Sequence, residues 1–138
     1  GGARVKIPAI LFAVSNRALF CFALMDNDRP TMKTKLYNAP FFNIYADGNV
    51  CLGTAKVGKQ KARTFEQEAE RFERGFYMAE QSGGNVASNC KTPLPALWKR
   101  LIKSKTPFPS KTELKPHDKY KTLESLINKL HKKYYGED

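Results

Sequence analysis

The chain has 138 residues, of which 41% are hydrophobic and 12% aromatic, so it is long enough to bury one core. Its 24 lysines and arginines outnumber 13 aspartates and glutamates, and this formal net charge of +11 favours an acidic partner, either nucleic acid or an acidic protein surface. No apolar run is long enough to span a bilayer, and no signal-peptide pattern follows Gly1-Gly2, which resembles a cloning remnant. We therefore expect a single cytoplasmic domain over residues 1–138.

The candidate nucleophiles and metal ligands are three cysteines and two histidines, namely Cys21, Cys51, Cys90, His117 and His131. No two cysteines form a Cys-x-x-Cys pair, and an odd number argues against a disulfide framework. Two histidines far apart in the sequence do not indicate a zinc site. We expect reduced thiols, no metal and no cofactor.

The N-terminal part has the pattern of a buried antiparallel hairpin. Apolar runs at residues 10–14 and 18–25 flank a short polar segment that suits a tight connection between two strands. Cys21 lies in the middle of the second run and is expected to be a small core residue. A third strand is predicted over residues 33–37.

A second hairpin is predicted around an Asp-Gly pair. Residues 43–45 and 49–52 bracket this turn, in which Asp47-Gly48 supplies the positive φ angle of a tight reversal. The turn places Asn43 on one side and Cys51 on the other. These two residues are therefore expected to be neighbours.

The next segment has the composition of an exposed loop followed by a helix. Residues 54–63 have little to bury. Their basic residues include Lys56, Lys59, Lys61 and Arg63. Thr64 opens a helix with the Thr-x-x-Gln spacing of a capping box, and this helix ends before Gly83. A small polar loop up to residue 89 is expected to be mobile and to carry Cys90.

Two more helices are predicted in the C-terminal third. Thr92 is the expected N-cap of the first, with Pro93 at its first position. Its predicted buried residues are Leu94, Leu97, Trp98, Leu101 and Ile102. The final helix begins at Thr122, and its predicted apolar face comprises Leu123, Leu126, Ile127, Leu130 and Tyr134. Because strands come first and helices follow, we predict the α+β class, with an antiparallel β-meander followed by helices packed on one face.

Cys51 is the residue with the clearest chemical potential. It ends a short strand beside the basic loop, which leaves the thiol near the surface and favours the thiolate. A thiol that only relays an activated acyl group depends less on a base, but it needs a donor for the tetrahedral oxyanion. The side-chain amide of Asn43 is the candidate donor, although an asparagine here can also serve only to bond its own backbone. A cysteine hydrolase would instead need His117 or His131 brought to the thiol by the fold.

Residues 43–52 read Asn-Ile-Tyr-Ala-Asp-Gly-Asn-Val-Cys-Leu and resemble the active-site segment of ubiquitin-conjugating enzymes. In that family an Asn stands eight residues before the catalytic Cys and a Gly three before it, with a branched apolar residue just before the Cys and a Leu just after. Asn43, Gly48, Val50 and Leu52 occupy these four positions relative to Cys51.

The chain more closely resembles one bacterial branch, the prokaryotic ubiquitin-conjugating-enzyme-like family D, the family of PRTRC system protein B. The resemblance extends from Ile7 to Ile127. It is carried by Arg29-Pro30-Thr31, Leu36-Tyr37-Asn38-Ala39-Pro40, residues 43–53, Leu97-Trp98 and Phe108-Pro109. Phe41-Phe42 replace the His-Pro that precedes the Asn in eukaryotic enzymes, and the Trp-x-Pro after the Cys is absent. These departures weaken the case for lysine-directed transfer more than that for thioester formation.

The resemblance implies a ubiquitin-conjugating-enzyme-like fold and an acyltransferase activity. A ThiF-like activating enzyme would adenylate a ubiquitin-like protein and pass it to Cys51 as a thioester, and a metallopeptidase would reverse the product. Asn43 would hold the oxyanion and position the acceptor amine. Asp47 and Gly48 would set the turn, with Asp47 adjusting the basicity of the amine. The basic residues of the 54–63 loop would dock an acidic patch of a partner, unless they are only solvated charges.

Two other functions stay open. The first is nucleic-acid binding through the basic C-terminal third, in which Tyr120, Tyr134 and Tyr135 could stack on bases. The basic residues concerned are Lys99, Arg100, Lys103, Lys105, Lys111, Lys115, Lys119, Lys121, Lys129, Lys132 and Lys133. The second is a scaffold that binds the ubiquitin-like partner without catalysis. Cys90 is also a candidate for the more reactive thiol, because its loop is expected to be exposed.

Overall fold

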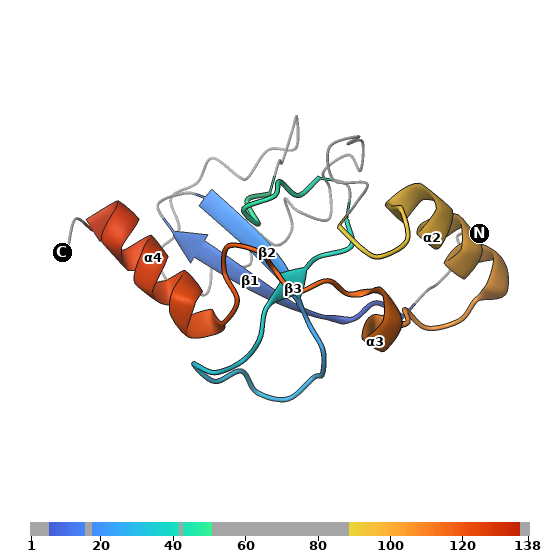
Figure 1. The fold of residues 1–138 in the computed structure, drawn as a ribbon, viewed down its shortest axis with the longest axis horizontal. Helices are drawn as coiled ribbons and strands as arrows, with labels where there is room; N and C mark the ends of the chain where they lie inside the picture. The colour runs from blue at the N-terminus through green and yellow to red at the C-terminus, as the bar shows by residue number, and fades with distance from the viewer. Residues whose placement is uncertain (1–5, 16–17, 42, 51–88, 136–138) are drawn as a thin grey trace, which may run out of the picture.

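The computed structural model describes residues 6–15, 18–41, 43–50 and 89–135 (Figure 1). These residues form a three-stranded antiparallel sheet and three helices, so the predicted α+β class is confirmed. In chain order the elements are β1 Ala9–Ser15, β2 Ala18–Leu24, β3 Tyr37–Asn38, α2 Leu94–Ser104, α3 Ser110–Glu113 and α4 Leu123–Tyr135. The predicted basic loop at residues 54–63 and the helix predicted from Thr64 lie outside the described residues.

The first two strands form the hairpin that the apolar runs predict. β1 and β2 pair antiparallel over their full lengths, with Phe12 opposite Cys21. The sheet has the order β1-β2-β3, so β2 is the central strand. Cys21 is fully buried, which confirms its assignment to the core.

The third strand is shorter than predicted. Tyr37 and Asn38 pair with β2, whereas the strand was predicted over residues 33–37. Residues 34–38 instead bond to the C-terminal segment. These backbone hydrogen bonds run from Leu36 N to Lys121 O, from His117 N to Leu36 O and from Asn38 N to Lys115 O, each at 3.0 Å. Buried backbone groups need hydrogen-bond partners. The segment around His117 provides partners that a longer β3 would otherwise have found in the sheet.

Both faces of β2 are covered, each by a different helix. Successive side chains of a strand point to opposite faces. Ala23 packs in a cluster with the buried leucines of α2, whereas Phe22 packs with Leu126 and Leu130 of α4. In Figure 1, α4 and α2 lie at opposite ends of the view with the hairpin between them. The prediction that the helices pack on one face is therefore wrong for these two helices, because β2 is apolar on both faces and each face needs cover.

The start of α2 differs from the prediction by one residue. Pro93, not Thr92, is the N-cap, and it makes no side-chain capping bond. Thr92 bonds instead to the buried carboxylate of Glu113 at the end of α3, through its amide (2.8 Å) and its hydroxyl (2.8 Å). The short helix α3 has no periodic apolar pattern, and the sequence did not predict it. The bond to Glu113, a residue distant in the chain, has thus replaced the predicted capping bond of Thr92.

The apolar faces of α2 and α4 are largely as predicted. The residues confirmed as buried are Leu94, Leu97, Leu101, Leu126 and Leu130. Ile102 and Ile127 are 49% and 43% exposed, so their predicted burial is wrong. Thr122 caps α4 through reciprocal bonds with Ser125. The side chain of Tyr134 lies outside the described residues.

The bond between Thr92 and Glu113 predicts a measurable stability difference. Burial alone would raise the pKa of Glu113, but hydrogen bonds from Thr92 and Arg100 outweigh this effect and lower it. We expect Thr92→Val to lower the free energy of unfolding by about 1–2 kcal/mol, since it removes a bond to a charged, buried acceptor. Urea unfolding followed by circular dichroism measures this difference.

Thr112→Val is the matched control, because the Thr112 hydroxyl is exposed and bonds to the neighbouring Pro109 carbonyl (3.2 Å). It should change the free energy of unfolding by about 0.5 kcal/mol or less. Equal losses in the two variants would contradict a special role for the Thr92 contact.

Candidate active site

The predicted second hairpin is present as a tight turn. Tyr45 N donates to Asn49 O at 2.8 Å, and Gly48 N donates to Tyr45 O at 2.9 Å. The Asp47 carboxylate accepts a further bond from Asn49 N at 2.9 Å. Gly48 has a φ of 89°, a conformation that L side chains rarely adopt. Asp47 and Gly48 therefore set the turn as the sequence predicts.

The turn is fixed to the part of β2 that β3 leaves unpaired. Gly48 O accepts a hydrogen bond from Cys21 N at 2.9 Å, and Val50 N donates to Leu19 O at 2.8 Å. On one face of the sheet Ile44 and Val50 pack with Leu19 and Cys21. Backbone bonds and apolar packing thus both hold residues 43–50 against the central strand.

The ring of Phe22 lies directly under Gly48. A Cβ atom built on Gly48 would lie 2.5 Å from Cζ of Phe22, which is closer than real Cβ contacts. Glycine is therefore required here twice, by the positive φ angle and by the approach of the aromatic ring. The close contact brings the turn down onto the core.

Segment 39–41, which leads into the site, is held by residues from outside the sheet. The indole Nε1 of Trp98 on α2 donates to Pro40 O at 2.7 Å, and the Trp98 ring stacks on Phe41 with centroids 6.3 Å apart. The side-chain amide of Asn89 donates to Ala39 O at 3.1 Å. Phe41, which stands where eukaryotic conjugating enzymes have a histidine, therefore supports the segment by stacking.

Asn43 and Cys51 are described to different extents. Asn43 is buried, at 6% exposed, next to Ile44, whose backbone pairs with Val50. Cys51 follows Val50 in the sequence but lies outside the described residues, as do Lys56, Lys59, Lys61 and Arg63. The separation of the Asn43 amide from the Cys51 thiol therefore stays a prediction.

The two described cysteines are unsuited to nucleophilic chemistry. Burial raises the pKa of the Cys21 thiol far above its ordinary value. Cys90 is 1% exposed and pairs with Leu114, and its pKa is raised to about 12 by burial and by the charge of Glu113, despite an opposing effect of Lys115. The prediction that Cys90 is an exposed, reactive thiol is therefore wrong, because its backbone joins the chain at α3 and its side chain enters the α2 cluster.

His117 lies beside the turn, a position that the sequence did not predict for it. It is 1% exposed, and its Nδ1 accepts bonds from the amides of Lys119 (3.2 Å) and Tyr120 (2.9 Å). Its ring meets Phe22 edge-on, with centroids 5.0 Å apart, and stacks on Tyr120 at 5.5 Å. Burial lowers the pKa of the imidazole, against the effect of the Ala46 backbone. His117 thus joins the C-terminal segment to the turn.

The basic C-terminal third is exposed, but its central tyrosine is not. Most of its lysines, including Lys99 and Lys103, lie in solvent. Tyr120 is 4% exposed and packs against Phe22, with Lys119 Nζ 5.3 Å from its ring centroid. The prediction that Tyr120 could stack on bases is therefore wrong, because its ring belongs to the core. The side chains of Tyr134 and Tyr135 lie outside the described residues.

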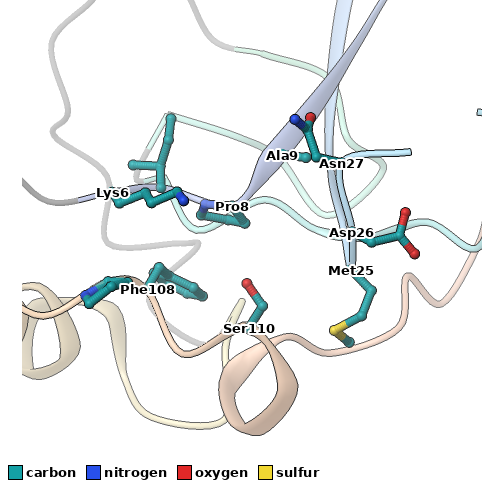
Figure 2. A pocket seen from close by; sticks show the side chains of 10 residues that line it. Lys6, Pro8, Ala9, Met25, Asp26, Asn27, Phe108 and Ser110 are labelled. Atoms are coloured by element: carbon teal, nitrogen blue, oxygen red, sulfur yellow. The ribbon is translucent and has the colours of Figure 1, made fainter. Parts of the chain in front are cut away.

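The pocket in Figure 2 is separate from the turn. It measures about 430 Å³ and lies where β1 begins and β2 ends. Its polar lining residues are Lys6, Asp26, Asn27 and Ser110. None of its lining residues belongs to segment 43–50. Among the described residues no three histidine, cysteine or acidic side chains gather as metal ligands, and no described helix is long and apolar enough to cross a membrane.

The geometry of the turn predicts the effect of Gly48→Ala. The added methyl group meets the Phe22 ring and also strains a backbone with positive φ, so we expect a loss of about 2–4 kcal/mol in the free energy of unfolding. In the Gly48→Ala/Phe22→Leu double variant the smaller side chain makes room for the methyl group. The losses in free energy of unfolding of the two single variants should then add up to more than the loss in the double variant. A double-mutant cycle measures this difference. Simple additivity would contradict the contact.

Thiol labelling tests the buried cysteines. At about pH 7.5 we expect iodoacetamide to modify the native protein once, at Cys51, because a thiol with a strongly raised pKa is almost wholly protonated. Intact-mass spectrometry should show this label unchanged in Cys90→Ser and lost in Cys51→Ser. Rapid native labelling of Cys90 would contradict its burial. Guanidinium chloride should make all three thiols reactive.

A comparison with protein families adds an independent finding. The model of prokaryotic E2 family D matches residues 1–117. This match covers β1, β2, β3, α2, α3 and the whole of segment 43–50. The comparisons with curated proteins and with solved structures found no match.

Proposed function

The chain belongs to prokaryotic E2 family D, and we propose that it is a ubiquitin-conjugating-enzyme-like carrier. In this proposal a ThiF-like enzyme activates the C-terminal carboxyl group of a ubiquitin-like protein. The Cys51 thiolate then accepts the acyl group as a thioester and passes it to an acceptor. The same proposal gives the chain a ubiquitin-conjugating-enzyme-like fold, of which the described three-stranded antiparallel sheet forms part.

One observation carries the proposal, namely that the segment preceding Cys51 is a built turn. Two backbone hydrogen bonds close the turn on itself, and two more, together with the Phe22 contact, fix it to β2. A carrier cysteine needs a defined position relative to its oxyanion donor, because electrostatic stabilisation depends on preorganised geometry. The turn supplies a rigid base from which the chain continues to Cys51.

The state of the other thiols supports Cys51 as the nucleophile. The chain has three cysteines, and both Cys21 and Cys90 are buried with raised pKa values. Only a thiolate attacks a carbonyl efficiently. A thioester carrier in this chain would therefore depend on Cys51.

The proposed reaction has two acyl-transfer steps. In the first, the Cys51 sulfur attacks the activated carbonyl, a carbon–sulfur bond forms, and the leaving group on the activating enzyme departs with its electron pair. In the second, an acceptor nucleophile such as an amine attacks the thioester, loses a proton to solvent, and Cys51 leaves as a thiolate. Both steps pass through a tetrahedral oxyanion, which the Asn43 amide would stabilise as a hydrogen-bond donor.

Asp47 and Gly48 act in this proposal through the turn. The Asp47 carboxylate accepts a bond from the Asn49 amide, which is a structural task. Its negative charge lies four residues after Asn43, the proposed oxyanion donor. There it would raise the pKa of a nearby acceptor amine and so adjust the basicity of that amine. The basic residues Lys56, Lys59, Lys61 and Arg63 would dock an acidic patch on a partner.

A charging assay tests the proposal. The domain is mixed with a ThiF-like activating enzyme, its ubiquitin-like protein and ATP, and the products are separated on non-reducing gels. We expect a thiol-sensitive adduct with wild type and with Cys90→Ser. Cys51→Ala should form none, and Cys51→Ser should form none or a thiol-resistant ester.

The same assay separates the alternatives. No adduct from an activating enzyme that forms its own adenylate would contradict a carrier. Binding of the ubiquitin-like protein that persists in Cys51→Ala would then indicate a non-catalytic binding module. DNA binding that falls steeply with salt and ignores Cys51→Ala would indicate the nucleic-acid alternative.

A further inference from the structure

The ring of His117 lies where the C-terminal segment meets the turn. From β2 it is met by Phe22, whose ring also lies under Gly48, and from its own segment it is met by Tyr120. From the turn, the Ala46 backbone raises the pKa of the ring, which is the effect of a carbonyl acceptor. Three segments far apart in the sequence therefore converge on one imidazole.

The hydrogen bonds of His117 determine its tautomer. Because Nδ1 accepts bonds from two amides, it carries no proton, and the proton of the neutral ring lies on Nε2. Nε2 is buried and forms no hydrogen bond of good geometry with the described residues. The Ala46 backbone acts on the ring from the turn in the direction of an acceptor, and we infer that its carbonyl is the group that faces Nε2–H.

We propose that His117 is a positioning residue of the candidate site, which holds the Tyr45–Asn49 turn in place through its Nε2–H group and the Ala46 carbonyl. A buried N–H group is costly to leave without an acceptor, so the ring favours the turn conformation that presents this carbonyl. The ring also completes the aromatic support beneath Gly48. The effect of His117 on the turn is independent of the proposed function, whereas an effect on the reactivity of Cys51 rests on it.

The contact depends on pH. The neutral ring gains its second proton at Nδ1. Protonated Nδ1 can no longer accept the hydrogen bonds from the Lys119 and Tyr120 amides. The charged groups that act on the ring are Asp47 from the turn and Asp118 and Lys119 from its own segment. Burial, the largest effect, keeps the pKa below its ordinary value of 6.5. The unfolded chain therefore binds this proton more readily, and the stability that the neutral ring contributes is lost as pH falls below about 6.5 towards the folded pKa.

Two conservative variants separate the two ends of the ring. His117→Asn places an oxygen where Nδ1 lies and keeps an acceptor for the Lys119 and Tyr120 amides, but it does not reach Ala46. His117→Gln places an N–H group near the position of Nε2 and can still meet the Ala46 carbonyl. His131→Asn, at an exposed position of α4, controls for the loss of a histidine.

Amide hydrogen exchange followed by NMR tests the effect on the turn. We expect the Tyr45 and Gly48 amides to exchange about five- to tenfold faster in His117→Asn than in wild type and in His131→Asn, as for one lost buried contact. His117→Gln should stay close to wild type. In both His117 variants the loss of protection between about pH 6.5 and 5 should be smaller than in wild type. Unchanged turn amides in His117→Asn, or an equal acceleration across the β1–β2 hairpin, would overturn the proposal.

The charging assay adds the functional result. We expect His117→Asn to lower the maximal rate of Cys51 charging about five- to tenfold while leaving the KM for the activating enzyme unchanged, and His131→Asn to match wild type. Normal charging by a variant whose turn exchanges faster would overturn a positioning role for Cys51. If wild type itself is not charged, the carrier function fails, and the exchange data alone decide whether His117 holds the turn.

Discussion

The position of the Phe22 ring is the constraint on which the candidate site depends. Phe22 is fully buried in the central strand, where it packs with Leu126 of α4 and meets the ring of His117. The same ring lies so close to Gly48 that no side chain fits there. Core packing and the geometry of the site are therefore coupled, since a shift of Phe22 would move both its contacts with α4 and the turn at Gly48.

Local patterns predicted the features that depend on local physics. The β1–β2 hairpin follows from two apolar runs, and the turn follows from Asp47-Gly48. A positive φ angle and an Asp side chain that bonds the amide two residues on need no distant partner. The buried leucines of α2 and α4 follow from helical spacing in the same way. The family, too, could be recognised from the residues of the turn segment, and the match over residues 1–117 confirms it.

The errors arise where distant segments compete with local signals. Thr92 has the composition of an N-cap, but the Glu113 carboxylate binds it across a separation of 21 residues. Cys90 follows a segment of small polar residues, yet pairing with Leu114 draws it into the core. His117 carries no local mark of its place, because its position is set by bonds between residues 34–38 and the C-terminal segment. No periodicity in a single sequence encodes such pairings.

The structural unit that supports the site extends past the family match. The match ends at His117, whereas Tyr120, Leu126 and Leu130 cover the same face of β2 as Phe22. Without them Phe22 would lose its cover from α4, and the amide of Tyr120 could not bond Nδ1 of His117. A turn whose support lies partly in α4 ties the geometry of the site to the docking of that helix, because an aromatic ring holds its place only when both of its sides are packed. The residues after the match therefore belong to the same cooperative core as the turn that leads to Cys51.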